Sequence, residues 1–289
     1  MNEVIFLNNK IKDFFAGKDP FEWAKNIDGT IFRDLDNRVT KEFVLDGELY
    51  FIKMHLGIGW SEILKNLLQL KKPAYGAYDE WKALIKLKEI GINCPEPLAF
   101  GRKGNNPSKL ESFIITKSLI NTSSLEEITL SWKLSPPSKG LKDLLVKNVA
   151  SLSRKLHLNG MNHRDLYLCH FHVENDGAHN IIYLIDLHRA QIRNSIPNRW
   201  RVKDIGGLLH SAINLGFSEK DFYRFFMIYF NCSLKELFLY HRRFIRLSSL
   251  RAFKMFMKPR TDKRINRALL NFKNYKKLAR ALKNLNKDI

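Results

Sequence analysis

Two aspartates in the middle of the chain stand on adjacent loops, each beside apolar residues that would anchor it. Asp165 belongs to Asn162-His163-Arg164-Asp165, and Asp186 directly follows the apolar run Ile181-Ile182-Tyr183-Leu184-Ile185. Phosphoryl transfer needs one carboxylate to accept a hydroxyl proton and another to hold Mg2+ on the nucleotide phosphates. The two aspartates meet both needs, so the pattern predicts this chemistry. A buried structural turn with a salt bridge is the alternative.

A third candidate, His170, lies five residues after Asp165. In kinase catalytic loops that begin His-Arg-Asp, the residue at this spacing is a metal-facing asparagine. Imidazole is a poorer Mg2+ ligand than an amide oxygen. A metal role and a structural hydrogen bond are therefore both open for His170.

The chain before these loops is rich in strands. Polar and apolar residues alternate over residues 40–45 and 48–54, on either side of Asp46-Gly47. This pattern is a strong signal for a hairpin with a two-residue turn. The second strand ends its apolar run at Lys53, where a kinase small lobe carries the lysine that pairs with the nucleotide phosphates. An ordinary solvated lysine is the alternative.

A helix is expected over residues 78–90, because its apolar residues repeat at helical spacing and Gly91 ends the pattern. Glu80 lies in the first turn of this helix. In kinases an acid on the corresponding helix pairs with the phosphate-binding lysine, so we expect Glu80 to pair with Lys53. An acid favoured at a helix start by the helix dipole is the alternative.

Two segments depart from the kinase pattern. Residues 33–38 stand where a glycine-rich loop is expected, yet they contain no glycine. Arg33 or Arg38 could bind phosphates there by charge, and an ordinary surface role is the alternative. Residues 55–76 form an insertion with a short amphipathic stretch, and we expect it to fold over a cleft.

Strands are expected over residues 98–100 and 112–116, and helices over residues 125–130 and 141–158. The small polar residues 117–124 separate the strand-rich half from the helical half. We therefore divide the chain into a lead-in (1–29), a small lobe (30–118) with the 55–76 insertion, and a helical large lobe (119–289). In the large lobe, Asp204 in the first turn of a later helix is a candidate acceptor of backbone N–H groups from the catalytic loop. An acid favoured at a helix start by the helix dipole is the alternative. Further helices are expected over residues 218–230 and 233–257.

The composition supports a protein with a real core and an anionic partner. Apolar residues make up 45% of the 289 residues, and the formal net charge is +20. Such a charge favours nucleotides, phosphorylated sugars, phospholipid surfaces or nucleic acids as partners. The three cysteines form no CxxC pattern, which favours free thiols in a reducing cytosol. The chain has neither a secretory signal pattern nor an apolar run long enough to span a bilayer.

The positive charge is concentrated at the end of the chain. Residues 241–289 contain 16 lysines and arginines against two acids. We expect residues 241–257 to pack on the large lobe, and residues 263–287 to bind an anionic membrane surface. The apolar residues expected on one side of the first segment are Phe244, Leu247, Leu250, Phe253 and Phe256.

Taken together, these motifs resemble the lipopolysaccharide core heptose(I) kinases, over roughly residues 30–215. The most specific pieces are His163-Arg164-Asp165 with Cys169-His170-Phe171, and Asp186-Leu187-His188-Arg189-Ala190-Gln191. The resemblance implies an α+β, bilobal, protein-kinase-like fold, with an antiparallel sheet and one main helix in the small lobe. It also implies phosphorylation of an inner-core heptose hydroxyl by ATP and Mg2+, at the cytoplasmic face of the inner membrane.

By this resemblance, Asp165 would be the catalytic base and Asp186 a metal ligand. Lys53 would pair with the phosphates, with Glu80 as its partner, and His170 would face the metal. The Ala-Pro-Glu motif that ends a protein kinase activation segment is missing. Its absence argues against peptide substrates and against regulation by activation-loop phosphorylation.

Two other functions stay open at this point. One is a kinase of the same fold that acts on another lipopolysaccharide sugar or on a small molecule. The other is a non-catalytic nucleic-acid or membrane-binding protein whose activity depends on the basic tail. Because Lys53, Asp165 and Asp186 are all present, the catalytic interpretation is favoured, and no specific nucleic acid is expected as a partner.

Overall fold

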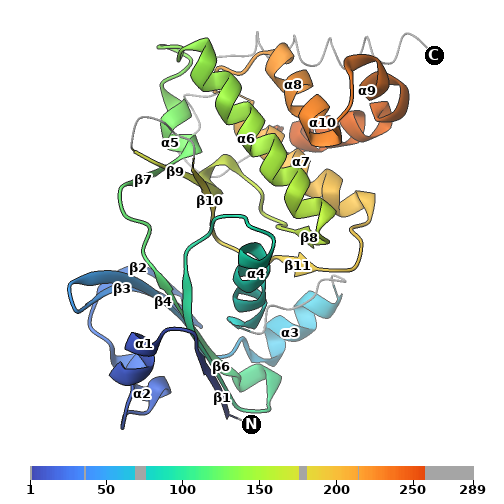
Figure 1. Ribbon diagram of the computed structural model, residues 1–289. Coiled ribbons are helices and arrows are strands. Elements are labelled where there is room, and N and C mark those ends of the chain that lie inside the picture. Colours follow the sequence, from blue (N-terminus) through green and yellow to red (C-terminus); the bar gives the residue numbers. More distant parts are fainter. Residues whose placement is uncertain (1, 36, 69–75, 176–180, 214, 258–289) are drawn as a thin grey trace. The chain divides into compact units, whose positions relative to one another are not determined.

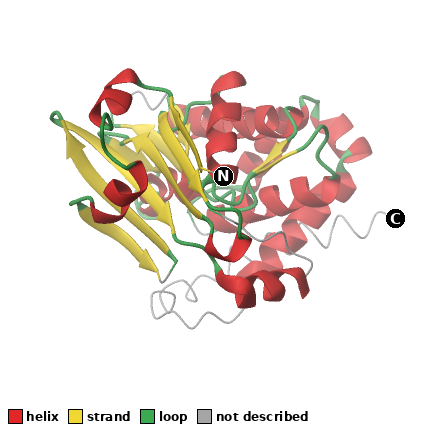
Figure 2. Ribbon diagram, turned by 90° about the horizontal axis from the view of Figure 1, so that it is seen from below, coloured by secondary structure: helices red, strands yellow, loops and turns green. Residues whose placement is uncertain are grey.

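The computed structural model describes residues 2–35, 37–68, 76–175, 181–213 and 215–257. The chain forms two compact units. The N-terminal unit contains Met1–Ile120 and Ile185–Gln191, and the C-terminal unit contains the remaining residues. Strands dominate the first unit and helices the second (Figures 1 and 2). Among the described residues, no helix is long and apolar enough to cross a bilayer.

The N-terminal unit is built on an antiparallel sheet whose described strands lie in the order β1-β5-β6-β4-β3-β2. The predicted hairpin is confirmed: Asp46 and Gly47 form its turn, with φ of 49° and 78°. Both values suit a type I′ turn, which matches the twist of the flanking strands. The strands are β1 (Asn2–Phe6), β2 (Thr30–Leu35), β3 (Arg38–Leu45), β4 (Glu48–His55), β5 (Pro97–Lys103) and β6 (Glu111–Lys117).

Helices flank this sheet. The helix expected over 78–90 is confirmed as α4, and the insertion after β4 contains a helix, α3. Residues 69–75 of the insertion lie outside the described residues, so its expected fold over a cleft stays a prediction. The strand β1 was not expected, because five residues of mixed polarity carry little periodic signal. The helices are α1 (Asn9–Phe14), α2 (Pro20–Asn26), α3 (Gly59–Leu68), α4 (Tyr78–Glu89) and the 3-10 turn η1 (Pro107–Lys109).

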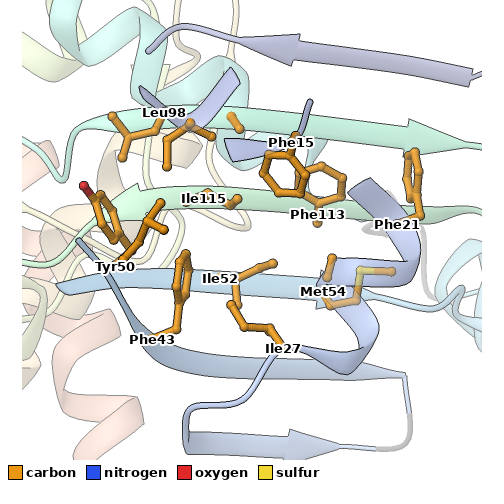
Figure 3. Close-up of a cluster of buried hydrophobic side chains, with 14 residues drawn as sticks. Phe15, Phe21, Ile27, Phe43, Tyr50, Ile52, Met54, Leu98, Phe113 and Ile115 are labelled. Carbon is orange, nitrogen blue, oxygen red and sulfur yellow. The ribbon is translucent and has the colours of Figure 1, made fainter. Parts of the chain in front are cut away.

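The sheet buries its two faces differently. One face packs with α1 and α2 around a cluster of aromatic and aliphatic side chains (Figure 3). Strand β4 gives Tyr50, Ile52 and Met54 to this cluster. Because successive side chains of a strand point to opposite faces, Lys53 lies on the other face. Phe100 of β5 stacks on Trp81 of α4, with ring centroids 5.5 Å apart. The alternation therefore directs Lys53 to the face that α4 covers.

The C-terminal unit is mainly helical, with short strands and the 3-10 turn η2 around its loops. The helices expected over 125–130, 141–158 and 218–230 are confirmed as α5, α6 and α8. The helices are α5 (Leu125–Leu130), α6 (Lys139–Leu158), α7 (Asn198–Ala212), α8 (Glu219–Phe230), α9 (Leu234–Tyr240) and α10 (Arg242–Phe256). The strands and the turn are β7 (Thr122–Ser124), β8 (Met161–Asn162), η2 (Leu168–His170), β9 (Phe171–Glu174), β10 (Ile182–Leu184) and β11 (Gln191–Ile192).

The prediction of a single helix over residues 233–257 is wrong. Two helices, α9 and α10, occupy this segment, and His241 lies between them as the cap residue of both. The expected packing of this segment is confirmed, since α10 contacts α7 extensively. The buried face is offset from the one expected: Leu247 and Leu250 are exposed. Small residues are buried in their place, at Ser248, Ser249 and Ala252. They suit a close approach, in which the aliphatic part of Arg251 packs against Gly206.

Candidate active site

Three of the predicted site residues come together in the N-terminal unit. Lys53 Nζ lies 2.5 Å from Glu80 Oε1 and 3.9 Å from Asp186 Oδ1. The Glu80 carboxylate is buried, and Lys53 and Asp186 are half-buried. A lysine that binds nucleotide phosphates and a carboxylate that binds their metal must reach the same phosphates. The separation of 3.9 Å satisfies this requirement.

A second group of basic side chains lies on the same face of the sheet. Arg38 pairs with His55 across β3 and β4, and Thr40 pairs with Lys53. His55 is two residues from Lys53, so both point to one face. Burial lowers the pKa of His55 to about 3, with further contributions from Arg38, Lys53 and His188. His55 is therefore neutral at physiological pH, in a field of positive charge that suits phosphate. The sequence analysis missed His55, although its place two residues after Lys53 was an available signal.

Asp186 is held in a defined orientation. Its φ of 58° lies in the left-handed region, which aspartate tolerates better than most residues. His188 Nδ1 lies 2.6 Å from Asp186 Oδ1, and this contact fixes one carboxylate oxygen. The sequence analysis names His188 only as part of the motif Asp186–Gln191, without a role of its own. The local structure thus holds Asp186 in place beside Lys53.

In the C-terminal unit, one carboxylate holds the catalytic loop, residues His163–His170. Asp204 Oδ2 accepts the backbone N–H of His163 at 2.7 Å, and Oδ1 accepts that of Arg164 at 2.8 Å. These bonds confirm the interpretation of Asp204 as an acceptor for this loop. Its expected place in the first turn of the helix is wrong, because α7 begins at Asn198. Asp204 is fully buried, and Arg164 has a φ of 74°. The carboxylate therefore stabilises a backbone turn that non-glycine residues rarely adopt.

A buried network continues from Asp204 through three helices. His157 of α6 lies with Nε2 3.2 Å from Asp204 Oδ2 and Nδ1 2.6 Å from the Tyr229 hydroxyl of α8. Arg201 of α7 donates its Nε–H to the same hydroxyl at 2.9 Å. Burial is the main reason that the pKa of Tyr229 rises to about 12. No periodic signal in the sequence indicates this network, because its members come from distant helices.

Asp165 and His170 are also together in the C-terminal unit. His170 Nδ1 lies 2.7 Å from the backbone carbonyl oxygen of Asp165. A carbonyl oxygen can only accept, so Nδ1 carries the hydrogen. The ring of His170 also stacks on that of His163, with centroids 5.5 Å apart. His170 thus makes the structural hydrogen bond foreseen as one of its two roles, and its role as a metal ligand stays a prediction.

The donors present fit a magnesium ion that is shared with a nucleotide. Among the described residues, no group of three or more histidine, cysteine or acidic side chains could hold a metal ion without other ligands. Mg2+ does not need such a cage, because it usually binds one or two carboxylates together with phosphates and water. Asp186 supplies a hard oxygen donor 3.9 Å from Lys53, the lysine predicted to bind phosphates. It is therefore a better candidate ligand than His170.

With this geometry established, known proteins can be compared. The model of the lipopolysaccharide kinase (Kdo/WaaP) family matches residues 22–229. The chain belongs to this family. It is similar to the lipopolysaccharide core heptose(I) kinase WaaP of Escherichia coli K12, with 39% identity over 90% of this chain and 99% of the relative. With that of Pseudomonas aeruginosa it shares 40% identity over 81% of this chain and 88% of the relative.

A solved structure extends the comparison to the fold. The structure of WaaP in complex with acyl carrier protein has a TM-score of 0.76 and 32% identity to this chain, covering 88% of it and 99% of the solved chain. The predicted bilobal kinase-like fold and the predicted kinase class are thereby confirmed. A non-catalytic binding protein is disfavoured, since the family and the curated relatives are named as kinases.

The burial of neutral His55 gives a prediction about pH. Its folded-state pKa of about 3 lies below its ordinary value of 6.5, so the unfolded chain binds the proton first. This contribution to the free energy of unfolding is complete above about pH 6.5 and is lost as the pH falls toward 3. It should amount to roughly 2 kcal/mol between about pH 6.5 and pH 5. In urea titrations, His55→Gln should lack this part of the decline, and an unchanged pH dependence would contradict the assignment.

Proposed function

We propose that this chain transfers a phosphoryl group from ATP to a heptose hydroxyl of the lipopolysaccharide inner core. The observation that carries the proposal is the grouping of Lys53, Glu80 and Asp186 in a member of the lipopolysaccharide kinase family. The curated relatives named as heptose(I) kinases support the acceptor. Their alignments span most of both chains, so the relationship is not limited to one segment.

In this proposal the N-terminal unit binds the nucleotide. Lys53 pairs with its phosphates, and Glu80 fixes the ammonium group of Lys53 from the buried side. Asp186 and, less favourably, His170 are the proposed ligands of Mg2+, which neutralises charge on the phosphates. The arginine Arg38 adds a fixed positive charge on the same face of the sheet as Lys53. Together these side chains orient the phosphate that is transferred.

Asp165 is the proposed catalytic base, which accepts the proton of the attacking sugar hydroxyl. Support comes from the rigidity of its loop, since the two preceding backbone N–H groups bind Asp204 and the Asp165 carbonyl binds His170. A base must lie within hydrogen-bond distance of the proton that it removes, so fixing its backbone limits the positions that it can adopt.

The acceptor sugar has one specific alternative. The family name includes Kdo as well as WaaP, so a kinase of another inner-core sugar is the second candidate. Incubation of the protein with ATP and truncated core acceptors, followed by NMR location of the phosphate, distinguishes the two sugars. Phosphate on a sugar other than heptose would contradict the first assignment.

We further propose that the enzyme acts peripherally at the cytoplasmic face of the inner membrane. The net charge of +20 favours an anionic surface, and the proposed acceptor is anchored by lipid. The sequence also predicted that residues 263–287 bind this surface. These residues lie outside the described part of the chain, and their role stays a prediction.

An acyl carrier protein is a proposed partner, by analogy with the solved relative that was determined in complex with one. The C-terminal unit contains an apolar cavity of about 50 Å3, which supplies apolar walls but would have to widen to take a fatty acyl chain. The cavity is lined by Leu125, Thr129, Leu145, Val146, Val149, Leu168, Leu208, Leu209, Ala212, Phe217, Asp221, Phe222 and Phe225.

The role of Asp165 is tested by Asp165→Asn, which keeps the shape of the side chain and removes the proton acceptor. We expect kcat to fall by about 100-fold or more, because general-base catalysis contributes that much. Nucleotide affinity, measured by calorimetry, should change little. Turnover within a few-fold of the wild type would show that Asp165 is not the catalytic carboxylate.

The nucleotide site is tested by Lys53→Ala and Asp186→Ala. Each should lower phosphoryl transfer by about 100-fold or more, since each removes an electrostatic contact to the phosphates. Asp186→Ala should also alter the dependence of kcat/KM on Mg2+ concentration, whereas Lys53→Ala should not. Lys82→Ala, on the exposed side of α4, is the matched control and should retain activity. An unchanged Mg2+ dependence in Asp186→Ala would contradict its role as a ligand.

The acyl carrier partner is tested by comparing its acylated and unacylated forms. The form with a long acyl chain should bind at least about tenfold more tightly, because each buried methylene contributes about 0.8 kcal/mol. Ala212→Leu, which narrows the cavity, should reduce the difference in affinity between the acylated and unacylated forms. The melting temperature of this variant verifies that the fold is retained. Equal binding of both forms, measured by surface plasmon resonance, would exclude an acyl site.

A further inference from the structure

A groove in the C-terminal unit, which none of the residues His163–His170 lines, is not used by the proposed reaction. We call it the α7–α10 groove, because α7 and α10 supply most of its walls, and its volume is about 1040 Å3. Ligand sites in proteins typically span about 300–1,000 Å3, so the groove can hold a sizeable ligand. It is lined by Asn198, Arg199, Arg201, Val202, Lys203, Phe230, Tyr240, His241, Arg243, Phe244, Leu247, Leu250, Arg251, Lys254 and Met255.

The chemistry of this groove is both basic and apolar. Arginine and lysine occur at six of its lining positions, and no acidic residue is among the described residues that line it. On α10, the exposed residues Arg243, Leu247, Leu250 and Lys254 follow one another at spacings of four, three and four. This spacing places them in one stripe along the helix. The stripe carries a cation at each end and two leucines between them, 43% and 37% exposed.

The cations on the α7 side are held in place before any ligand arrives. Arg201 lies with its guanidinium carbon 5.3 Å from the ring of Tyr229, 5.6 Å from that of Phe230 and 5.4 Å from that of Phe244. Its Nε–H also binds the Tyr229 hydroxyl. A guanidinium fixed in this way loses little conformational entropy when it binds an anion, and its fork of donors suits phosphate.

Positive charge is also crowded around the neighbouring residue Trp200. Arg199 and Lys203 lie 5.2 Å and 4.2 Å from its ring, and Arg193 lies 5.2 Å from it. Burial lowers the pKa of Arg193, and the charge of Arg199 lowers it further. Like charges gathered around one ring repel one another, and a bound anion would offset this repulsion.

We propose that the α7–α10 groove binds the anionic headgroups of a phospholipid bilayer, with Leu247 and Leu250 inserted at the boundary of the acyl chains. A soluble anion would explain the cations but not the two exposed leucines between them. The chain's own residues 258–289 are a poor occupant, because they contain 11 basic residues and two acids. Basic residues that flank exposed leucines on one helix face are typical of elements that lie in a membrane interface.

This inference rests on the proposed function in one respect: a lipid-anchored acceptor lies at a membrane surface. It assigns the docking surface to described residues of α7 and α10, independently of the tail 263–287. It also predicts that membrane binding depends on both the basic residues and the leucines of the groove. Simple attraction of a basic tail would depend on charge alone.

The test is vesicle flotation with the full chain, on phosphatidylcholine alone and on phosphatidylcholine mixed with phosphatidylglycerol. The double variant Arg243→Gln/Lys254→Gln should bind the anionic vesicles about 25-fold more weakly, or about fivefold for each basic residue near the surface. Arg246→Gln/Lys235→Gln is the matched control, because both residues are exposed and neither lines the groove. The control should lose much less binding.

The apolar part of the site is tested in the same assay. Leu247→Ser/Leu250→Ser should weaken binding to the anionic vesicles about tenfold, because burial of apolar surface is lost. Leu234→Ser/Leu239→Ser is the matched control, with two exposed leucines of α9 that do not line the groove. The melting temperatures of all four variants verify that the fold is retained.

Three results would overturn the proposal. Equal loss in the groove and control charge variants would mean that binding is spread over the surface. Undiminished binding of the leucine variant would mean that the groove takes a soluble anion or an acidic protein. Absence of wild-type binding to anionic vesicles would exclude a membrane site altogether. Turnover of the wild type on a soluble acceptor is measured in parallel, and its absence would contradict the proposed function but not the groove.

Discussion

The carboxylate of Asp204 is the constraint on which the C-terminal unit depends. It is fully buried, and it accepts the N–H groups of His163 and Arg164. A non-glycine residue in the left-handed region costs on the order of 1–3 kcal/mol, and charge-assisted hydrogen bonds can offset this cost at Arg164. The buried carboxylate in turn needs these donors, because an unpaired charge would be very unfavourable there. The close packing of α10 on α7 serves the same end, since α7 carries Asp204.

In the N-terminal unit, the position of Lys53 is fixed by the alternation of side chains along β4. Tyr50, Ile52 and Met54 are fixed in the core on one face of the sheet, so Lys53 has no alternative to the other face. A shift of one residue in the register of β4 would bury the lysine and expose the core. The position of Lys53, the proposed phosphate-binding side chain, is therefore fixed by the hydrophobic residues next to it in sequence. The ion pair with Glu80 adds orientation to a position already set by the sheet.

The parts of the structure that could be predicted have short-range signals. The Asp46-Gly47 turn, the helical spacing of α4 and α6, and the acid Glu80 in the first turn of α4 each involve residues close in sequence. The network of His157, Tyr229 and Arg201 could not be predicted, because it joins three helices and depends on how they pack. The exposure of Leu247 was also missed, since periodicity indicates a helical face but not which face a neighbour covers. Small residues on α10 and Gly206 on α7 decided that question.

The discontinuity of the N-terminal unit has a consequence during protein synthesis. Residues up to Ile120 leave the ribosome well before Ile185–Gln191, the stretch that completes this unit and carries Asp186. The nascent chain can therefore form the sheet and the Lys53–Glu80 ion pair before Asp186, the second acidic neighbour of Lys53, has been synthesised. The N-terminal unit gains Asp186 only after translation has passed through α6 and residues His163–His170. A ribosome-bound fragment that ends before Asp186 thus carries an ordered lysine without the residue proposed to bring the metal to it.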